Sequence, residues 1–287
     1  MNATASGNTT VTGKTALLGL LGWPVKHSLS PRLHNYWLAQ CGIDAVYLPL
    51  PVAPEALAAV LPALPKMGFV GVNVTIPHKE ALCGLVGTLD PVAARISAVN
   101  TVAFPANRTS IGSNTDAFGF AESVRQAGHN LAAGPALVLG AGGAARAVLA
   151  ALQASGCPEI LLANRTPERA LTLAQQFPGV KVTPWEKWHE PLAQTSLLIN
   201  TTSRGLNGQD DFIVDLTTMP GNAAVCDLVY RPLQTGLLRA ADAAGLSPID
   251  GLGMLLYQAQ ASFNTWFGVT PPIDAALRRF VLAGIAV

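Results

Sequence analysis

The sequence predicts an α/β protein of two domains, each built on a parallel or largely parallel sheet. Three observations support this. The chain has 287 residues, about twice the ~150 residues of a typical domain. Short apolar runs typical of strands alternate with helical stretches along most of its length, as in proteins with parallel sheets. A glycine-rich turn at 140–146 lies between a predicted strand and a predicted helix.

The composition suits a soluble globular protein. Half of the residues are apolar and 12% are charged, which predicts a large core and argues against disorder. Eighteen basic residues oppose seventeen acidic ones, so the net charge is +1. A charge so close to zero excludes proteins that bind nucleic acid or anionic membranes through excess charge. No apolar run approaches the ~20 residues that a membrane-spanning helix needs.

The first half of the chain predicts strands at 16–21, 45–50, 71–74 and 99–104, and helices at 31–41, at 54–61 and from Pro77. The first dozen residues are small and polar and predict a mobile extension. The apolar run after Lys14 is interpreted as a buried strand rather than a signal peptide, so we expect a cytoplasmic location. The four cysteines lie far apart in sequence and are expected to be free thiols, with no metal site.

A second series of elements follows Asp116. Helices are expected at 117–127, after the glycine turn to about 154, and from 167, and strands at 136–139, 160–163, 180–182, 197–200, 225–229 and 246–249. The last forty residues are expected to be helical, because apolar residues recur there at helical spacing: Leu252, Leu256, Ala259, Phe263 and Trp266. Met254 and Gln258 lie one turn apart on an adjoining face, where they can contact something other than that core.

The glycine turn predicts a dinucleotide site. Its sequence is Gly140-Ala141-Gly142-Gly143-Ala144-Ala145-Arg146. A strand enters, glycines turn tightly, and the start of a helix presents amide groups to a pyrophosphate. Ala145 takes the place of a third glycine and is small enough for the helix to pack on the strand. The alternative is an ordinary turn of an α/β domain.

The segment after the next strand indicates which dinucleotide is bound. An NAD site usually places an acidic residue there for the ribose 2′-hydroxyl. This chain has Asn164-Arg165-Thr166, with Arg169 four residues after Arg165. Two guanidinium groups beside a hydroxyl suit a 2′-phosphate, so we expect a preference for NADP(H). The alternative is a pair of solvated arginines at the start of a helix.

Polar residues in the first domain suggest an anion or substrate site. Ser28 and Ser30 alternate, so their hydroxyls would point the same way from an extended segment and could bind a carboxylate. The alternative is that Ser30 caps the helix after it. His27 and His34 are interpreted as turn or packing residues.

Three further polar groups lie at or near the ends of predicted strands: Asn73 and Thr75 with Lys79, Asn100 with Thr101, and Asn114, Thr115 and Asp116. In open α/β sheets, strand ends are where ligands bind. Lys79 is expected in the first turn of a helix, where the helix dipole disfavours its charge and could tune it for proton transfer. On its own, however, a lysine is most often a solvated surface residue.

Together these motifs resemble the shikimate dehydrogenase family over about residues 16–272. The resemblance rests on Ser28-x-Ser30-Pro31, residues 73–79, residues 98–101, Asn114-Thr115-Asp116, Gly140–Arg146, Asn164-Arg165-Thr166, residues 200–205, Tyr230-Arg231-Pro232, residues 250–255 and Gln258-Ala259. It implies a Rossmann-type NADP domain at 116–250 and a discontinuous α/β substrate domain at 1–115 and 251–287, with a cleft between them. The implied activity is the NADP-dependent interconversion of 3-dehydroshikimate and shikimate on the route to chorismate and the aromatic amino acids.

The resemblance also implies roles for individual residues. Lys79 would be the acid/base, with Asp116 as its partner. The substrate would contact Ser28, Ser30 and Tyr230 through its carboxylate, and Thr75, Asn100, Asp116 and Gln258 through its ring hydroxyls, with Asn73 nearby. NADP would contact Gly140, Ala141, Gly142, Gly143, Ala144, Asn164, Arg165, Thr166, Arg169, Thr201, Ser203, Leu228, Gly251 and Met254. Two alternatives stay open, a quinate/shikimate dehydrogenase and a non-catalytic NADP-binding sensor, as does the choice between monomer and homodimer.

Overall fold

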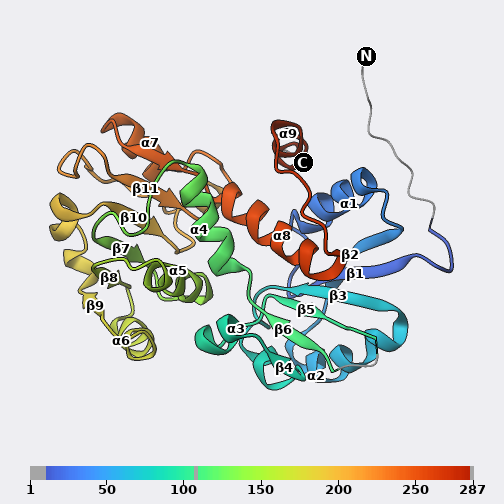
Figure 1. Ribbon diagram of the computed structural model, residues 1–287. Coiled ribbons are helices and arrows are strands. Elements are labelled where there is room, and N and C mark those ends of the chain that lie inside the picture. The colour runs from blue at the N-terminus through green and yellow to red at the C-terminus, as the bar shows by residue number, and fades with distance from the viewer. Residues whose placement is uncertain (1–10, 107–108, 285–287) are drawn as a thin grey trace, which may run out of the picture. The chain divides into compact units, whose positions relative to one another are not determined.

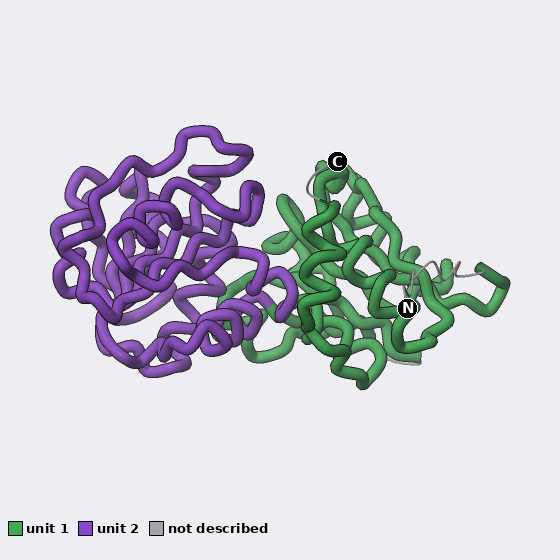
Figure 2. Tube along the Cα trace, turned by 90° about the horizontal axis from the view of Figure 1, so that it is seen from above, with its two compact units in different colours: residues 1–115, 259–287 green, residues 116–258 purple. Residues whose placement is uncertain are grey.

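The computed structural model describes residues 11–106 and 109–284 and contains two compact units (Figures 1 and 2). Unit 1 comprises residues 1–115 and 259–287, and unit 2 comprises residues 116–258. The sequence placed the return to the first domain at residue 251, whereas the structure keeps residues 251–258 with unit 2. Most of the expected N-terminal extension, residues 1–10, lies outside the described residues.

Unit 1 contains a mixed six-stranded sheet in the order β2-β1-β3-β5-β6-β4. Its strands are β1 (Ala16–Gly22), β2 (Ala45–Pro51), β3 (Phe69–Val74), β4 (Thr88–Leu89), β5 (Thr101–Ala103) and β6 (Ile111–Ser113). β1 runs parallel to β2 and β3, and β4 runs parallel to β6. β5 is antiparallel to both of its neighbours, β3 and β6, and is shorter than the expected strand at 99–104.

The helices of unit 1 are short apart from those near its two chain ends. They are α1 (Ser30–Cys41), α2 (Leu57–Val60), α3 (Pro91–Ile96), α9 (Ala275–Leu282) and the end of α8 (Gly251–Phe267), with 3₁₀ turns at Pro54–Ala56, Leu61–Ala63, Pro65–Met67 and Ala81–Gly84. Residues 54–61, expected as a helix, are helical, but they are divided into a 3₁₀ turn, α2 and the start of a second 3₁₀ turn. Pro62 and Pro65 lack amide donors, so α2 ends at Val60 and the chain after it continues in short 3₁₀ turns. The expected helical C-terminus is interrupted at 268–274, where Pro271 and Pro272 stand.

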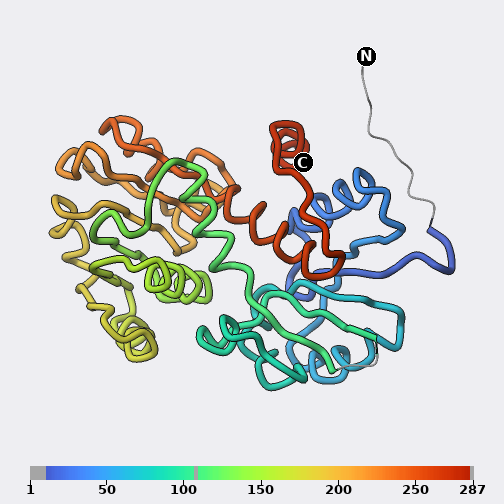
Figure 3. The backbone as a smooth tube through the Cα atoms, in the orientation of Figure 1, coloured from blue at the N-terminus to red at the C-terminus, as the bar shows by residue number. Residues whose placement is uncertain are grey.

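The C-terminal segment packs against the N-terminal helix of unit 1 (Figure 3). α9 contacts α1. The guanidinium of Arg32 donates from Nε to the carbonyl oxygen of Phe280 at 2.7 Å and lies 4.0 Å from the centre of the Phe280 ring. Trp37 donates from Nε1 to the carbonyl of Pro272 at 3.2 Å. The C-terminal segment thus completes the fold that begins with β1.

Unit 2 contains an all-parallel six-stranded sheet in the order β12-β11-β10-β7-β8-β9. The strands are β7 (Ala136–Leu139), β8 (Ile160–Ala163), β9 (Val180–Thr183), β10 (Leu197–Asn200), β11 (Ala224–Asp227) and β12 (Ser247–Ile249). The helices are α4 (Asp116–Gln126), α5 (Gly143–Ala154), α6 (Pro167–Gln176), α7 (Gly236–Ala243) and the start of α8, with 3₁₀ turns at Trp185–Lys187, Glu190–Gln194 and Leu206–Gly208. This is the strand order of the doubly wound dinucleotide-binding fold, whose order reverses between β7 and β10.

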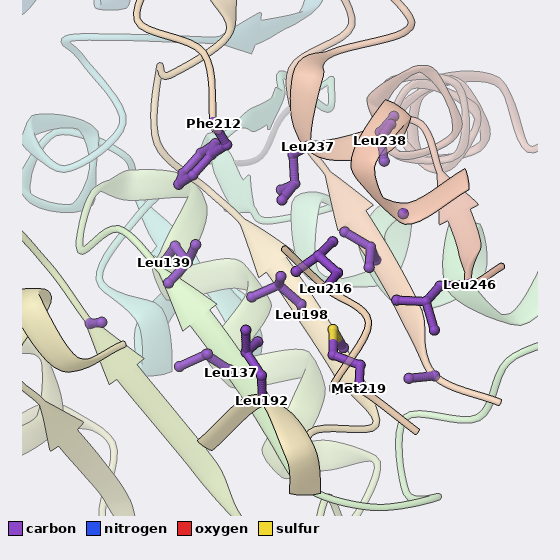
Figure 4. Packing of buried hydrophobic residues seen from close by; sticks show 14 residues of the cluster. Leu137, Leu139, Leu192, Leu198, Phe212, Leu216, Met219, Leu237, Leu238 and Leu246 are labelled. Atoms are coloured by element: carbon purple, nitrogen blue, oxygen red, sulfur yellow. The ribbon is translucent and has the colours of Figure 1, made fainter. Parts of the chain in front are cut away.

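A cluster of buried apolar side chains covers one face of the sheet of unit 2 (Figure 4). Leu137 and Leu198 project from neighbouring strands, and Phe212, Leu216 and Met219 pack against them from the irregular segment before β11. All five side chains are at most 5% exposed. Burial of this kind contributes about 25 cal/mol per Å² of apolar surface and fixes the strands whose ends carry the glycine turn.

None of the helices within the described ranges is long and apolar enough to cross a membrane. Within the same ranges, no group of three or more His, Cys, Asp and Glu side chains is placed to hold a metal ion.

Candidate nucleotide and substrate sites

The glycine turn of unit 2 has a backbone that only glycine adopts easily. Gly140 follows β7 with φ +106°. A Cβ atom at this position would lie 2.6 Å from Oγ1 of Thr201. The Thr201 hydroxyl donates a hydrogen bond to the carbonyl of Leu139 at 2.8 Å. Thr201, expected to contact the cofactor, therefore also holds the end of β10 against the start of the turn.

The next two glycines leave room for a ligand. A Cβ atom at Gly142 or Gly143 would meet nothing within 4 Å. α5 begins at Gly143, and no side chain caps its first amide groups. A helix start with unpaired amides and open space in front of it fits the pyrophosphate of a dinucleotide.

Asn164, at the end of β8, fixes the glycine turn from the neighbouring strand. Its Oδ1 accepts a hydrogen bond from the amide of Ala141 at 3.1 Å, and its Nδ2 donates to the carbonyl of Thr166 at 2.8 Å. Asn164 thus joins the turn to the segment that carries Arg165 and Arg169. Both arginines are exposed, as expected of groups that meet a phosphate from solvent.

The remaining expected cofactor residues lie in loops at the ends of strands or at the start of α8. Ser203 is exposed after β10. Gly251 approaches Leu228 so closely that a Cβ atom at Gly251 would lie 2.3 Å from the Leu228 carbonyl oxygen. Met254 is half-buried one turn further along the helix. The structure therefore brings Leu228 and Gly251 together, although they are far apart in the sequence.

Asp227 is a buried acid that the sequence analysis did not single out. Its carboxylate accepts hydrogen bonds from Asn200 Nδ2 at 2.8 Å, the Val229 amide at 3.0 Å and Thr235 Oγ1 at 2.7 Å. Burial raises the pKa of Asp227 to about 6, although these three hydrogen bonds oppose the rise. Asp227 thereby joins the loop that carries Thr201 to the loop that carries Leu228. In the sequence, this structural role of Asp227 is indicated by its position near the end of a predicted strand.

Three segments of unit 1 meet near the ends of β1 and β3. The amide of Thr75 donates to the carbonyl of Leu21 at 2.8 Å, and that of Trp23 donates to the carbonyl of Ile76 at 3.1 Å. The amide of Val74 donates to the carbonyl of Asn100 at 2.8 Å. These bonds hold the loop after β1, the loop after β3 and the segment before β5 side by side.

Lys79 lies in this group, but not in the helix that the sequence predicted. The chain from Ile76 to Glu80 forms turns, and a 3₁₀ turn begins only at Ala81. Lys79 therefore does not lie in the first turn of a helix, and the predicted effect of a helix dipole on it is wrong. The carbonyl of Lys79 accepts a hydrogen bond from the amide of Val99 at 2.8 Å. This bond, with that from Val74, places the backbone of Lys79 beside that of Asn100.

The serine segment also differs from its expected conformation. Residues around Ser28 form a turn in which the Ser28 amide donates to the carbonyl of Val25 at 3.1 Å, so the segment is not extended. Ser28 Oγ accepts from the amide of Ser30 at 3.2 Å. The alternative in which Ser30 caps the helix is wrong as well, because α1 begins at Ser30 and Leu29 takes the capping position without a side-chain bond.

A buried hydrogen-bond network lies behind Asn100. The Asn73 amide donates to Ser262 Oγ at 2.9 Å and to Thr101 Oγ1 at 3.1 Å, and Asn73 Oδ1 accepts from the Tyr47 hydroxyl at 2.8 Å. The Ser262 hydroxyl lies 2.8 Å from Thr101 Oγ1 and 3.2 Å from Thr115 Oγ1. Asn73, expected near the substrate, is thus a member of this network.

The network includes the side chain of Asn100. Its Oδ1 accepts from the Thr115 amide at 2.8 Å and from Thr101 Oγ1 at 2.9 Å, and its Nδ2 donates to Thr115 Oγ1 at 2.9 Å. These bonds determine the orientation of the Asn100 side-chain amide, that is, the positions of its oxygen and its nitrogen. Tyr47 and Ser262 were missed because nothing in their local sequence shows that they meet Asn73.

Comparison with known proteins identifies the family. Three family models match the chain: shikimate dehydrogenase substrate binding domain at 20–102, shikimate/quinate 5-dehydrogenase at 122–207 and shikimate 5′-dehydrogenase C-terminal domain at 251–279. A shikimate dehydrogenase (NADP(+)) of Paramagnetospirillum magneticum is 54% identical, over 95% of this chain and 100% of the relative. The chain belongs to the shikimate dehydrogenase family.

Solved structures of shikimate dehydrogenases have the same fold. Shikimate 5-dehydrogenase from Thermus thermophilus, in complex with NADP(H) and shikimate, is 40% identical with a TM-score of 0.85, over 94% of this chain and 100% of that one. Quinate dehydrogenase from Corynebacterium glutamicum in complex with NAD is 27% identical with a TM-score of 0.86, over 95% of this chain and 99% of that one.

The residues marked by the resemblance to shikimate dehydrogenases are divided between the two units. Unit 1 holds Ser28, Ser30, Thr75, Lys79 and Asn100, and unit 2 holds Asp116, Tyr230, Gln258 and every expected cofactor residue. Asp116 is the buried first residue of α4. Burial raises the pKa of Tyr230, partly offset by Arg231, so its phenol stays a neutral hydrogen-bond donor. That Lys79 and Asp116 act as a pair stays a prediction.

Proposed function

We propose that this chain is an NADP-linked shikimate dehydrogenase, which interconverts 3-dehydroshikimate and shikimate as part of aromatic amino acid biosynthesis. Unit 1 would bind the substrate and unit 2 the nucleotide. The observation that carries the proposal is the placement of Thr75, Lys79 and Asn100 side by side at the ends of β1 and β3. Similarity to shikimate dehydrogenases over nearly the whole chain supports the same activity.

Reduction of 3-dehydroshikimate requires a proton donor beside the substrate carbonyl. NADPH, when bound, supplies the hydride, and negative charge then develops on the carbonyl oxygen. The ammonium group of Lys79 would stabilise that charge and donate a proton, and its amine would take the proton back in the reverse direction. Asp116 would orient Lys79 and bind a ring hydroxyl.

Recognition of the rest of the substrate would fall to neutral polar groups. Ser28, Ser30 and Tyr230 would donate hydrogen bonds to its carboxylate. Thr75, Asn100 and Gln258 would bind the ring hydroxyls, with the direction of the Asn100 amide set by the network behind it. Because that network is buried and paired, Asn100 would lose little entropy on binding.

Binding of NADP would divide among three parts of unit 2. The amides at Gly142 and Gly143 would meet the pyrophosphate, and Arg165, Thr166 and Arg169 would meet the 2′-phosphate. Gly251 and Met254 would pack against the nicotinamide. The open space in front of Gly142 and Gly143 supports this assignment.

Initial rates with shikimate and quinate, each with NADP and NAD, test the proposal. We expect NADPH formation with shikimate to be fastest. Comparable rates on quinate would favour the broader quinate/shikimate dehydrogenase, for which the similarity to quinate dehydrogenase is the supporting observation. Absence of any shikimate-dependent NADPH formation would favour an NADP-binding sensor, and equal rates with NAD and NADP would remove the assigned role of Arg165.

We further propose a cytoplasmic enzyme that is a monomer or a homodimer and binds neither nucleic acid nor membranes. The small net charge supports the absence of nucleic acid and membrane partners. Light scattering after size-exclusion chromatography would measure the oligomeric state directly.

A further inference from the structure

Arg204 has a carboxylate partner in the loop that follows β10. Its Nη2 lies 3.2 Å from Oδ1 of Asp210, and its Nε donates to the Asp210 carbonyl at 3.0 Å. The guanidinium also lies 4.5 Å from the centre of the Phe212 ring. The Arg204 side chain is only 25% exposed, so it is held in place by the loop it contacts.

The same carboxylate faces a second arginine. Nη1 of Arg165 lies 3.9 Å from Oδ2 of Asp210, so one carboxylate lies between two guanidinium groups. Arg165 follows β8 and Arg204 follows β10, and these strands flank β7, which leads into the glycine turn. Both arginines therefore come from the carboxyl ends of the strands beside the proposed pyrophosphate site.

The contacts of Asp210 are weak enough to be exchanged. The side chains of Arg165 and Asp210 are 69% and 61% exposed, and ion pairs so accessible to water contribute little free energy. A phosphate carries more charge than a carboxylate and offers three acceptor oxygens to arginine forks. It would therefore compete well for both guanidinium groups.

We propose that Arg204 is an additional residue of the 2′-phosphate site and that Asp210 is the internal carboxylate which the phosphate displaces from Arg165 and Arg204. This inference rests on the proposed binding of NADP. Arg204 would bind the 2′-phosphate together with Arg165. Asp210 would lower the affinity for every ligand that carries a 2′-phosphate and would leave the affinity for ligands without one unchanged.

Calorimetric titration with 2′,5′-ADP and with 5′-ADP tests this without any catalysis. For Arg204→Gln we expect about tenfold weaker binding of 2′,5′-ADP and unchanged binding of 5′-ADP, since one charge-assisted contact is lost. For Asp210→Asn we expect about two- to fivefold tighter binding of 2′,5′-ADP only, in line with the small contribution of an exposed ion pair.

Two variants in unit 2 control for the loss of charge alone. Arg125→Gln removes an exposed arginine that pairs with Glu122 at 2.6 Å, and Asp215→Asn removes a carboxylate bonded to Thr217. Neither is expected to change the affinity for 2′,5′-ADP. Arg204→Lys, which keeps the charge but not the fork, is expected to fall between wild type and Arg204→Gln.

The outcomes separate this inference from the proposed function. Equal losses for 2′,5′-ADP and 5′-ADP in Arg204→Gln would show that Arg204 only holds its loop, and would overturn the inference. Weaker or unchanged binding of 2′,5′-ADP in Asp210→Asn would overturn it too. If the expected affinity changes occur but shikimate is not oxidised, the inference stands and the proposed function fails.

Discussion

The Asn73 amide on β3 donates a 2.9 Å hydrogen bond to the Ser262 hydroxyl on α8, and the two residues are 189 positions apart in the chain. Both side chains are buried, at 4% and 0% exposed. Through Thr101 and Thr115 the same hydroxyl group connects to the side chain of Asn100. A residue of α8 thus helps to orient a residue of the proposed substrate site.

Replacing Ser262 should affect both stability and substrate binding. Ser262→Ala removes a buried hydrogen-bond partner of Asn73, Thr101 and Thr115, which should lower the free energy of unfolding by about 1–3 kcal/mol. We expect KM for shikimate to rise several-fold, because the Asn100 amide is held less firmly, with a smaller change in kcat. Urea denaturation and steady-state kinetics measure the two effects. Thr265→Ala, which removes an exposed hydroxyl from the same helix, should change neither, and similar effects in both variants would refute a role for the network.

Two glycines of the same turn should respond differently to alanine. Gly140→Ala places a Cβ atom against Thr201 at φ +106° and should lower the melting temperature, since strain of this kind costs about 1–3 kcal/mol. Gly142→Ala adds a methyl group to open space, so the melting temperature should stay the same while KM for NADP rises. Thermal unfolding without ligand, together with NADP titration, separates the effects. A stability loss in Gly142→Ala as large as that in Gly140→Ala would contradict this account.

The sequence predicted best those elements whose signals are local. The strand at 136–139 has the predicted bounds, and the helix at 31–41 begins one residue earlier, because apolar runs, prolines and glycines mark their ends within a few residues. The turn at 140–143 was predicted for the same reason. The error at Pro77 is also instructive, because a proline suits both the first turn of a helix and a tight turn.

What the sequence could not supply were relationships across long separations. The pairing of Asn73 with Ser262, and of Asp227 with Asn200, depends on how the sheets assemble. A lone Ser262 in a helical pattern carries no sign of its partner. The contact of Asp210 with Arg165 is of the same kind, since the two residues lie in different loops.

His34 should make stability depend on pH. It is fully buried and stacks on Tyr47, with ring centres 4.3 Å apart. Burial lowers the pKa of His34 from 6.5 to about 3, only partly offset by Asn73. Between these values the unfolded chain binds a proton that the folded protein does not, so stability is lost as pH falls from 6.5 towards 3.

The variant His34→Phe tests this, because it keeps a flat ring but cannot bind a proton. We expect the wild type to lose about 1.4 kcal/mol per pH unit relative to His34→Phe in that window. Urea denaturation at several pH values between 4 and 6.5 measures the difference. His27→Gln, at an exposed site, should leave the slope of the wild type unchanged. Parallel pH profiles for wild type and His34→Phe would mean that His34 is not desolvated as described.

Lys79 should matter for the rate of the reaction far more than for binding. Its backbone is held by Val99, so Lys79→Met keeps the turn and the side-chain stem and removes only the ammonium group. Loss of a positioned proton donor should lower kcat by a factor of about 10² to 10⁴, while KM for shikimate stays within about threefold. Lys66→Met, at an exposed site in unit 1, should behave as wild type. If kcat survives in Lys79→Met, another group must move the proton, and the assignment of Lys79 fails even though the fold and the family remain as described.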